Sequence, residues 1–467
     1  MPKESSAPLQ LLRGMKDILP VDQPYWWATF DAVRRFAANY SFERIETPIL
    51  EPTNLFTRGV GQDTEVIGKE MYTFVDKGGD NVALRPEATA SVVRAYNEHG
   101  MLNLPQPVKM WYFSPMFRHD RPQAGRYRQF WQFGFEVLGS DHPVIEAQLI
   151  LLSRAVFREL GIETNLQINS LGDKAARTAY AKALQAFLKT KKSELSEEQR
   201  LTLQKNPLRL LDSKDPKIVE MLAEAPQIID YLDEASKQHF MSVLEYLDEA
   251  EVPYTLNPRL VRGLDYYNRT VFEFWAVGDD QGAVSLGGGG RYDALVENLG
   301  GRPTPAAGFA CGIERLVNLM REKQIVPPSS LHPEVFLAQL GEPARKKMLK
   351  LFEQLQAEGI RVTEALTKDG LKQQLEVANR IGAHYTMIIG QKELMDDTIL
   401  IRDMENGIQE VVDFKRAVVE MKKRVEKARA TGLKPVTGLV KPERMDHAAA
   451  HDGDEGLDGT ISLEDNA

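Results

Sequence analysis

The sequence has almost no cysteine and no long apolar run, and both absences limit what this protein can be. Cys311 is the only cysteine among 467 residues, which excludes a disulfide framework and any zinc site built on thiolates. No stretch approaches the roughly 18 consecutive apolar residues of a membrane-spanning helix. The first residues also lack the apolar core of a signal peptide. We therefore expect a cytoplasmic protein without membrane segments.

Several common catalytic signatures are missing as well. The eight histidines do not cluster at zinc-ligand spacing, and no G-x-S-x-G nucleophile elbow is present. The glycine-rich run Gly287–Asp293 lacks the Gly-Lys-Ser/Thr ending of a P-loop and the G-x-G-x-x-G context of a dinucleotide fold. We expect neither zinc nor an organic cofactor.

The charge is weakly acidic and unevenly distributed. The formal net charge is −9, and residues 441–467 carry −6 of it, with two basic and eight acidic side chains. Just before them, Lys422–Lys434 holds six basic residues against Glu426 alone. This basic segment suits either contacts with RNA phosphates or a solvated helix face, so a nucleic-acid partner stays open.

The predicted secondary structure changes in kind along the chain. The first and third of five regions mix strand and helix patterns, the second is almost wholly helical, the fourth alternates strands and helices, and the last is rich in Asp and Gly. We therefore predict a first domain interrupted by a helical insertion, then an α/β domain and a disordered tail. The predicted boundaries are 1–171, 172–251, 252–326, 331–430 and 431–467, with a linker at Pro327–Ser330.

Phe117–Glu136 is the segment richest in candidate chemistry. Four arginines crowd a turn between two apolar strands, and the planar fork of an arginine matches phosphate. Along the second strand, Gln132, Gly134 and Glu136 alternate with aromatic residues, which leaves one polar and nearly bare face for a flat ligand. A solvated basic hairpin would have the same composition, and this segment alone does not decide between the two.

Two further segments place polar side chains next to turns. Glu87 follows a strand-like Asn81–Leu84, and with Thr89 it could hold an ammonium group, although a helix N-terminal turn explains the same residues. Arg262 stands beside Gly263, which allows a ligand to approach the backbone closely. A tyrosine-bearing turn packed on the core is the alternative there.

Two small-residue segments lie further along the chain. The glycines Gly287–Gly290 precede a predicted helix at Ala294–Leu299. Their backbone N–H groups, at the N-terminus of that helix, would form an anion cradle. Ala306–Gly312 is a predicted strand that runs straight into a helix with Arg315 in its first turns. Arg315 could hold the far end of a ligand, or the small residues could serve close packing of helix on sheet.

Taken together, these segments resemble the histidyl-tRNA synthetases, which are class II aminoacyl-tRNA synthetases, in their bacterial form. The likeness covers essentially residues 10–425. Three segments resemble the motifs shared by the class: Thr47–Pro52, Phe117–Glu136 and Gly308–Leu316. Two more resemble the signatures peculiar to the histidine enzyme: Arg262–Tyr267 and Gly287–Asp293.

The resemblance implies an α+β fold: a catalytic domain on a mixed, mainly antiparallel sheet, with a helical insertion and a C-terminal α/β anticodon-binding domain. It implies a homodimer that activates histidine with Mg-ATP to histidyl-adenylate. The enzyme would then transfer the histidyl group to the 3′ end of tRNA(His), releasing AMP and pyrophosphate.

The resemblance also assigns roles to individual residues, although it identifies no magnesium ligand. The catalytic residues would be Arg262 and Arg118. The histidine-binding residues would be Glu87, Ala88, Thr89, Gln132, Glu136, Tyr266, Tyr267 and Arg262. The ATP-binding residues would be Arg118, Arg126 and Arg315, and Arg121 with Gln123 would meet the acceptor end of tRNA.

Two other functions compete with this interpretation. A regulatory paralogue of the synthetases would sense histidine while controlling a biosynthetic enzyme, but such proteins lack the anticodon domain and lose the phosphate-binding arginines. An RNA-binding or stress-signalling module built on a synthetase-like domain is the second, and no kinase signature accompanies it here.

Overall fold

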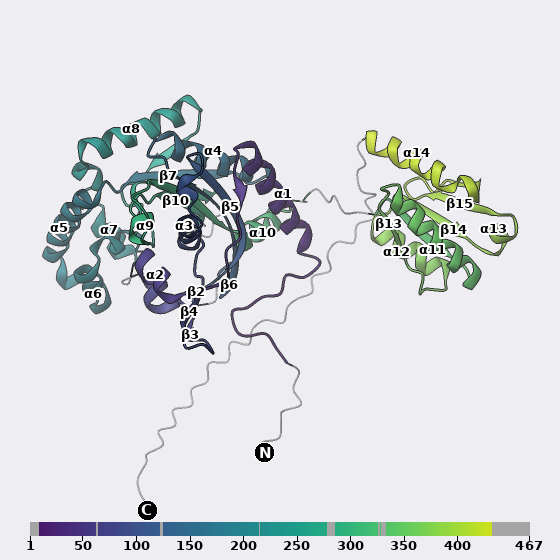
Figure 1. Cartoon of the computed structure of the whole chain (residues 1–467), viewed down its shortest axis with the longest axis horizontal. Coiled ribbons are helices and arrows are strands. Elements are labelled where there is room, and N and C mark those ends of the chain that lie inside the picture. Colours follow the sequence, from purple (N-terminus) through teal and green to yellow (C-terminus); the bar gives the residue numbers. More distant parts are fainter. Residues whose placement is uncertain are drawn as a thin grey trace, which may run out of the picture. The chain divides into compact units, whose positions relative to one another are not determined.

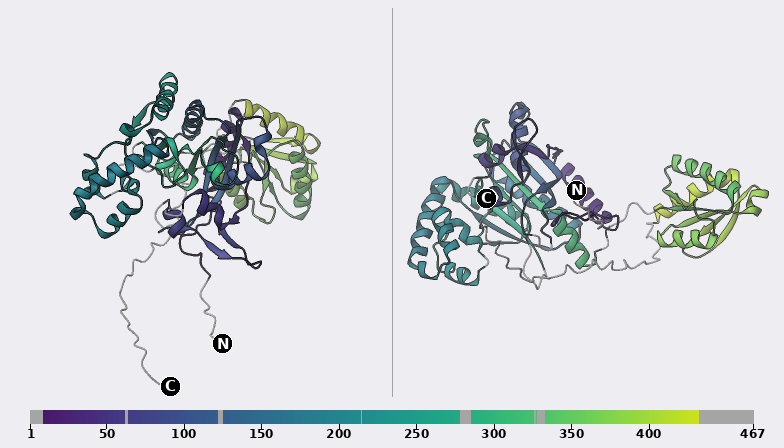
Figure 2. Two further views of the ribbon diagram at one scale, coloured as in Figure 1. Left: turned by 60° about the vertical axis from the view of Figure 1, so that its left-hand side comes forward. Right: turned by 90° about the horizontal axis from the view of Figure 1, so that it is seen from below.

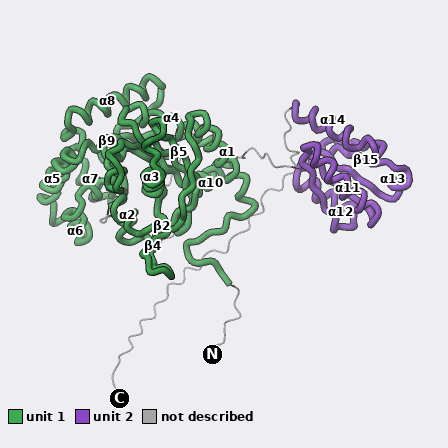
Figure 3. Tube along the Cα trace, in the orientation of Figure 1, with its two compact units in different colours: residues 1–328 green, residues 329–467 purple. Residues whose placement is uncertain are grey.

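The computed structural model describes residues 9–61, 64–121, 125–213, 215–277, 285–325, 327 and 333–431. The chain divides into two compact units, residues 1–328 and residues 329–467 (Figure 3). Gln123 and the acidic tail from residue 432 lie outside the described residues. No helix in the described part of the chain is long and apolar enough to cross a membrane.

Unit 1 is built on an eight-stranded sheet of order β1-β5-β6-β11-β10-β9-β7-β8 (Figure 1). All its pairs are antiparallel except β1 with β5 and β7 with β8. The strands are β1 Glu43–Arg44, β5 Val108–Phe117, β6 Gln129–Leu138, β7 Thr164–Ser170, β8 Tyr254–Leu256, β9 Asn268–Ala276, β10 Ser285–Arg291 and β11 Ala306–Gly312. The α+β fold expected from the sequence is confirmed.

One face of this sheet lies in a hydrophobic core of unit 1. It packs against α1 (Gln23–Asn39), α4 (Val144–Glu159) and α10 (Ile313–Glu322). Phe133 and Phe135 of β6 join this core, with the aromatic residues of β9 and β11. The opposite face of β6 carries Gln132, Gly134 and Glu136, so the predicted alternation of apolar and polar residues is confirmed.

Gly287–Gly290 do not form the predicted cradle at a helix N-terminus, and that expectation is wrong. They lie inside strand β10, between β9 and β11, and the helix that follows, α9, spans only Leu295–Asn298. Neighbouring groups leave no room for side chains there. A Cβ at Gly289 would lie 2.0 Å from the carbonyl oxygen of Gly308, and one at Gly288 would lie 2.6 Å from a guanidinium nitrogen of Arg262. The glycines therefore keep this part of the sheet bare.

Residues 174–249 form a cluster of helices at one side of unit 1, and the views in Figures 1 and 2 agree on this. The α-helices are α5 Lys174–Thr190, α6 Glu197–Lys205, α7 Pro216–Leu222 and α8 Glu234–Glu249, and the short helices are η3 Lys192–Glu194, η4 Pro207–Asp212 and η5 Ile228–Tyr231. Side chains cap the first turns, as when Asp173 accepts from the N–H of Ala176 at 2.7 Å. This region has the helical texture that the sequence predicts.

A three-stranded sheet of order β2-β4-β3 combines a strand just before helix α2 with two strands between α2 and α3. Its strands are β2 Leu50–Pro52, β3 Thr73–Val75 and β4 Asn81–Leu84, with helices α2 Thr53–Gly59, η1 Val66–Glu70, α3 Thr89–Glu98 and η2 Met101–Asn103 around them. The predicted strand Asn81–Leu84 and the helix start at Thr89 are confirmed. This arrangement places Glu87 directly between a strand and a helix.

Unit 2 is a sheet of order β13-β12-β14-β15-β16 with helices on both faces. Its elements are β12 Val335–Gln339, α11 Glu342–Ala357, β13 Val362–Glu364, α12 Leu371–Arg380, β14 Tyr385–Ile389, α13 Gln391–Met395, β15 Thr398–Asp403, β16 Gln409–Asp413, η6 Phe414–Arg416 and α14 Ala417–Ala430. Strands and helices alternate as the sequence predicts, and only the short α13 was not foreseen.

The basic segment at the end of unit 2 is largely engaged within the unit. Lys422 donates to Glu358 at 2.7 Å, and Arg424 pairs with Glu410. Arg429 forms a two-pronged ion pair with the buried Glu334, with both N···O distances 2.7 Å. These pairs favour a structural helix face over an RNA-binding patch for the described part of this segment.

Candidate active site

A cleft of about 670 Å³ opens over the polar face of the large sheet. Bare backbone at Gly287, Gly288 and Gly308 forms part of its lining. Side chains predicted from the sequence supply much of the rest, namely Glu87, Thr89, Arg118, Arg126, Gln132, Arg262, Tyr266, Tyr267 and Arg315. The fold therefore brings together residues from five separate segments of the chain.

Three other predicted residues do not line the cleft. Ala88 is buried as the residue before helix α3, and Glu136 lies behind Thr89, to which it is hydrogen-bonded at 2.7 Å. Arg121 is exposed, and its backbone N–H donates to the carboxylate of Asp120.

Arginines gather at one end of the cleft. Arg118 follows the last residue of β5, its Nε donates to the carbonyl of Pro86 at 2.8 Å, and its guanidinium lies over the ring of Phe130. Arg315 lies in the first turn of α10 and donates to the carbonyl of Ser285 at 2.6 Å. Burial, and then the nearby charge of Arg126, lower the pKa of Arg315. Cations that disfavour one another in this way create a site for a polyanion.

Arg262 comes from the loop before β9. One of its terminal nitrogens donates to Glu273 at 2.8 Å, and its guanidinium lies 5.9 Å from the centre of the Tyr267 ring. Burial works against its charge, but Glu273 and the neighbouring tyrosines raise the pKa of Arg262 overall. Its buried Nε has no hydrogen-bond partner within the part of the chain that the structure describes. Arg262 is thus a fixed cation with one donor to spare.

At the other end of the cleft, Glu136 lies buried behind the lining residue Thr89. Its carboxylate accepts one hydrogen bond from Thr89 and one from the hydroxyl of Tyr292, and the side chain is only 1% exposed. Burial raises the pKa of Glu136 to about 8. A Cβ at Gly308, its partner across the sheet, would lie 1.8 Å from the carboxylate. The bare strand is therefore required for Glu136 to lie where it does.

Glu87 has a local structural role as well. Its carboxylate accepts hydrogen bonds from the backbone N–H groups of Thr89 and Ala90, both at 2.8 Å, and so caps helix α3. Burial raises the pKa of Glu87. A ligand ammonium at this position would meet a carboxylate that is already fixed in orientation.

Sequence reasoning missed Glu273, Ser285 and Tyr292. The first two form a chain, since the hydroxyl of Ser285 donates to the Glu273 oxygen that also holds Arg262. Tyr292 packs edge-to-face on Tyr266, with ring centres 5.5 Å apart. Position could have identified two of these residues as part of the site. Tyr292 directly follows β10, the strand that contains the glycines, and Glu273 lies on β9, which pairs with β10.

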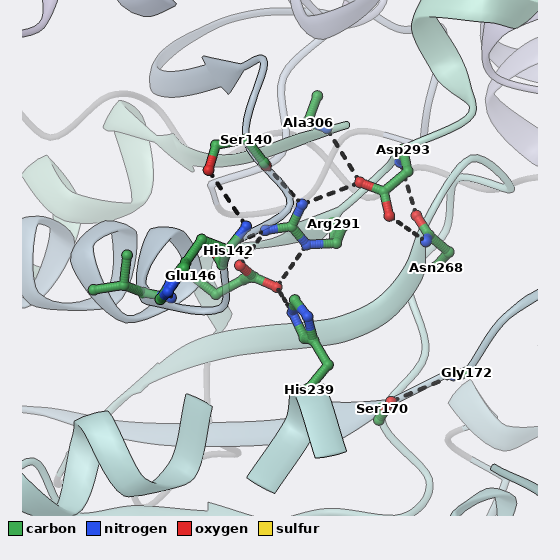
Figure 4. Close-up of polar contacts among 11 residues, drawn as sticks. Ser140, His142, Glu146, Ser170, Gly172, His239, Asn268, Arg291, Asp293 and Ala306 are labelled. Atoms are coloured by element: carbon green, nitrogen blue, oxygen red, sulfur yellow. Dashed lines mark hydrogen bonds and ion pairs between the residues drawn. The ribbon is translucent and has the colours of Figure 1, made fainter. Parts of the chain in front are cut away.

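A buried ion network holds the C-terminal end of strand β10, which contains the glycines (Figure 4). Arg291 has no exposed surface, and its guanidinium donates to both carboxylate oxygens of Glu146 at 2.8 and 2.5 Å. His239 of α8 contacts the same carboxylate at 2.6 Å, and Asp293 pairs with Arg291 at 3.1 Å. Because Arg291 precedes Tyr292, the network fixes the backbone that carries the Tyr292–Glu136 hydrogen bond.

A mainly antiparallel sheet with an arginine at a strand end and a second in the helix after the small-residue strand defines a class II aminoacyl-tRNA synthetase, an aminoacyl-tRNA ligase. Residues 14–316 match the family model for histidyl-tRNA synthetase, and residues 334–424 match that for an anticodon binding domain. The chain belongs to the histidyl-tRNA synthetase family.

Solved structures agree with this assignment. The chain is 35% identical to the apo histidyl-tRNA synthetase of S. aureus, with a TM-score of 0.75, over 89% of this chain and 100% of that one. A histidyl-tRNA synthetase from a Nostoc species shares the fold at 22% identity and a TM-score of 0.65, over 90% and 100% of the two chains. A Bacillus halodurans protein described as an ATP phosphoribosyltransferase regulatory subunit/histidyl-tRNA synthetase shares it at 21% identity and a TM-score of 0.56, over 77% and 93%.

Proposed function

We propose that this histidine–tRNA ligase activates histidine in the cleft of unit 1. A carboxylate oxygen of histidine attacks the α-phosphorus of ATP, the bond from that phosphorus to the bridging oxygen breaks, and pyrophosphate leaves. The 3′-terminal ribose of tRNA(His) then takes the histidyl group and AMP is released. The arrangement that carries this proposal is a group of arginines at one end of the cleft and buried hydrogen-bonding groups at the other.

The arginines divide the charge of the triphosphate among them. Arg118 would contact the α-phosphate, and Arg315, with Arg126 nearby, would contact the γ-phosphate. Arg262 stands between the two ends, and its spare Nε donor supports a contact with the phosphoryl oxygens as the fifth bond forms. A fixed cation of this kind stabilises developing charge without having to reorganise during the step.

The amino-acid end of the cleft would recognise histidine through hydrogen bonds, which form only in particular directions. Glu87, Thr89 and Gln132 would bind the ammonium group, with Ala88 supplying backbone alongside them. Glu136 and Tyr267 would meet the ring nitrogens, with Tyr266 beside them. A side chain without those two nitrogens would leave buried polar groups unpaired, which strongly disfavours wrong amino acids.

ATP would enter as its magnesium complex. Cleft carboxylates such as Glu70 and Glu273 are the oxygen donors that magnesium prefers. Among the described residues no group of three His, Cys, Asp or Glu is arranged to hold a metal by protein ligands alone. The proposed reaction takes its magnesium with the phosphates and uses neither zinc nor an organic cofactor.

The remaining proposals concern partners and location. Unit 2 would bind the anticodon of tRNA(His), and Arg121 with Gln123 would meet its acceptor end. A second copy of the chain would cover the exposed apolar residues Leu50, Phe74 and Val75 of the small sheet, giving a homodimer. The reaction would take place in the cytoplasm.

The decisive experiment is ATP–pyrophosphate exchange with each of the twenty amino acids in the absence of tRNA, followed by charging of tRNA(His). We expect exchange with histidine alone, then charging. The main alternative is a regulatory subunit, the function named for one structural relative. Folded protein that catalyses no exchange with any amino acid would support that alternative and contradict the ligase.

A further inference from the structure

Arg177 joins the helical region to the loop that carries Arg262 and Tyr267. It lies in the first turns of α5, and one of its terminal nitrogens donates to the carbonyl of Tyr267 at 2.5 Å and to that of Asp265 at 3.2 Å. Both acceptors are backbone groups. The contact therefore fixes the path of the loop and not the rotamer of one side chain.

The start of the loop from residue 257 to residue 267 is well supported, since the amide of Asn169 donates to the carbonyl of Leu260 at 3.0 Å and the N–H of Asn257 donates to the carbonyl of Ile168 at 3.0 Å. The part after Leu260 contains no helix or strand, so its backbone lacks regular ladder hydrogen bonds. A Cβ added at Gly263 would meet nothing within 4 Å, so this part of the loop has no close neighbour on that side. Besides the two contacts of Arg177, the N–H of Asp265 donates to the carbonyl of Val60 at 3.1 Å. The charge-assisted donor of Arg177 therefore helps to place residues 261–267.

The helical region also faces the cleft. Ser196, Gln199, Thr202 and Arg209, from α6, η4 and the segment before α6, line it opposite the sheet. The amide of Asn206, between these two helices, lies 3.5 Å from the carboxylate of Asp265. The same group of helices thus borders the ligand space and holds the loop that borders it.

The two ends of the helical region are attached differently. At α8, His239 joins the fully buried Glu146–Arg291 network, which leads to Tyr292. At α5, Arg177 is only partly buried and lies near the cleft. The first attachment leads to Tyr292 and Glu136, whereas the second leads directly to the loop that carries Arg262 and Tyr267.

We propose that Arg177 is a positioning residue for histidine activation, which couples the helical region to the loop bearing Arg262 and Tyr267. The proposal rests on the function proposed above for those two residues. Arg177 fixes the distance from the guanidinium of Arg262 to the reacting phosphate, and misplacement by about 1 Å can slow such a step roughly 100-fold.

Steady-state ATP–pyrophosphate exchange tests this with Arg177→Ala, Arg177→Lys and a control, Lys182→Ala, an exposed residue of the same helix. We expect Arg177→Ala to lower kcat roughly tenfold and to raise KM for histidine, with KM for ATP within about twofold of wild type. Arg177→Lys keeps the charge and one donor, so it should recover part of the loss. Wild-type values for kcat and KM in Arg177→Ala, or an equal change in all three parameters with a lowered Tm, would overturn the proposal.

Hydrogen–deuterium exchange of the full-length variants gives a readout that does not depend on activity. Amides of residues 260–268 should exchange faster in Arg177→Ala and, to a smaller degree, in Arg177→Lys, while Lys182→Ala matches wild type. Unchanged protection of these amides contradicts the positioning role even if the wild type proves inactive. If Arg177→Ala does not fold, Arg177→Lys carries both measurements. Absence of exchange activity in the wild type alone would instead contradict the proposed function.

Discussion

The two ends of the cleft are built in different ways. At the phosphate end, long arginine side chains contact backbone carbonyls and aromatic rings, and Arg126 is 43% exposed. At the amino-acid end, Glu136 and Tyr292 are each 1% exposed and bonded to each other. Charge acts at a distance and tolerates small displacements, whereas buried hydrogen bonds act only in one geometry. One end is therefore suited to stabilising a charged group and the other to selecting a shape.

Burying an ionisable side chain at the amino-acid end of the cleft disfavours its charged form. Burial raises the pKa of Glu136 to about 8, so the free enzyme favours the protonated, uncharged form of this side chain near neutral pH. At the phosphate end, Arg118 and Arg315 keep their charge although burial lowers the pKa of both guanidinium groups. Substitutions at the two ends should consequently fail in different ways, and the predictions below separate them.

The largest effect is expected for Arg262→Ala, which stands between the two ends. Adenylate formation should slow roughly 100- to 1,000-fold, because a preorganised cation is lost where charge develops. The Kd for histidine should stay within about threefold of wild type, since the charge is needed mainly in the transition state. Single-turnover kinetics with labelled ATP measure the chemical step, and equilibrium dialysis measures histidine binding.

Arg259→Ala is the matched control for that variant, because Arg259 is an exposed arginine in the same loop. It should leave both quantities unchanged. An unaltered chemical step in Arg262→Ala would show that the role assigned to Arg262 is wrong.

Glu136→Gln should lower kcat/KM for histidine roughly 100-fold, because the carboxyl group can give up its proton and accept from a ring N–H of histidine, whereas the amide cannot ionise. KM for ATP should not change, since the phosphates lie at the other end of the cleft. A parallel rise in KM for ATP would mean that the two ends are not separate in function.

The same variant makes a prediction about stability and pH. The unfolded chain loses the Glu136 proton near a pKa of about 4.3, whereas the folded protein keeps it up to about 8. The free energy of unfolding of the wild type should therefore fall relative to Glu136→Gln as the pH rises from about 4.5 to about 8, and the difference should then stay level. Thermal unfolding of both proteins between pH 5 and 9 checks this, and a gap that does not vary with pH would contradict the raised pKa.

Tyr292→Phe removes one donor to Glu136 and keeps the ring in place. We expect KM for histidine to rise roughly tenfold, the effect of losing one buried hydrogen bond, with kcat nearly unchanged. Tyr96→Phe is the control, because Tyr96 is equally buried and donates to Gln106 away from the cleft. Equal effects of the two substitutions would show that Tyr292 acts through general packing and not through Glu136.

Local patterns in the sequence were enough for residues whose position follows from one element. Arg118 stands where β5 ends and Arg315 in the first turn of α10, because strand alternation and helix signals place both. Glu87 follows in the same way from a strand that ends just before a helix. Most of unit 2 could be predicted for this reason, since each of its elements has its own period.

Contacts between distant segments could not be predicted in this way. Tyr292 and Glu136 are 156 residues apart, and Arg177 and Tyr267 are 90 apart, so no local period relates them. The glycine run was expected to form an anion cradle before a helix. It instead forms a strand paired with β9 and β11, where its neighbours, among them Arg262 and the backbone of Gly308, leave no room for side chains. Tertiary packing outweighed local propensity there.

The smallest effect is expected for Arg126→Ala, which tests the comparison within the phosphate end. Arg126 is half exposed and lies 3.3 Å from Asp120, and exposed ion pairs contribute roughly 1 kcal/mol or less. KM for ATP should thus rise only about two- to fivefold at low salt, and the difference from wild type should shrink near 0.5 M salt because screening is then strong. Arg315→Ala, which removes the more buried arginine, should raise KM for ATP further and lose less of its effect with salt. A salt-independent effect for Arg126→Ala as large as that of Arg315→Ala would mean that Arg126 closes onto the phosphates when ATP binds, and that burial in the free enzyme does not rank the arginines.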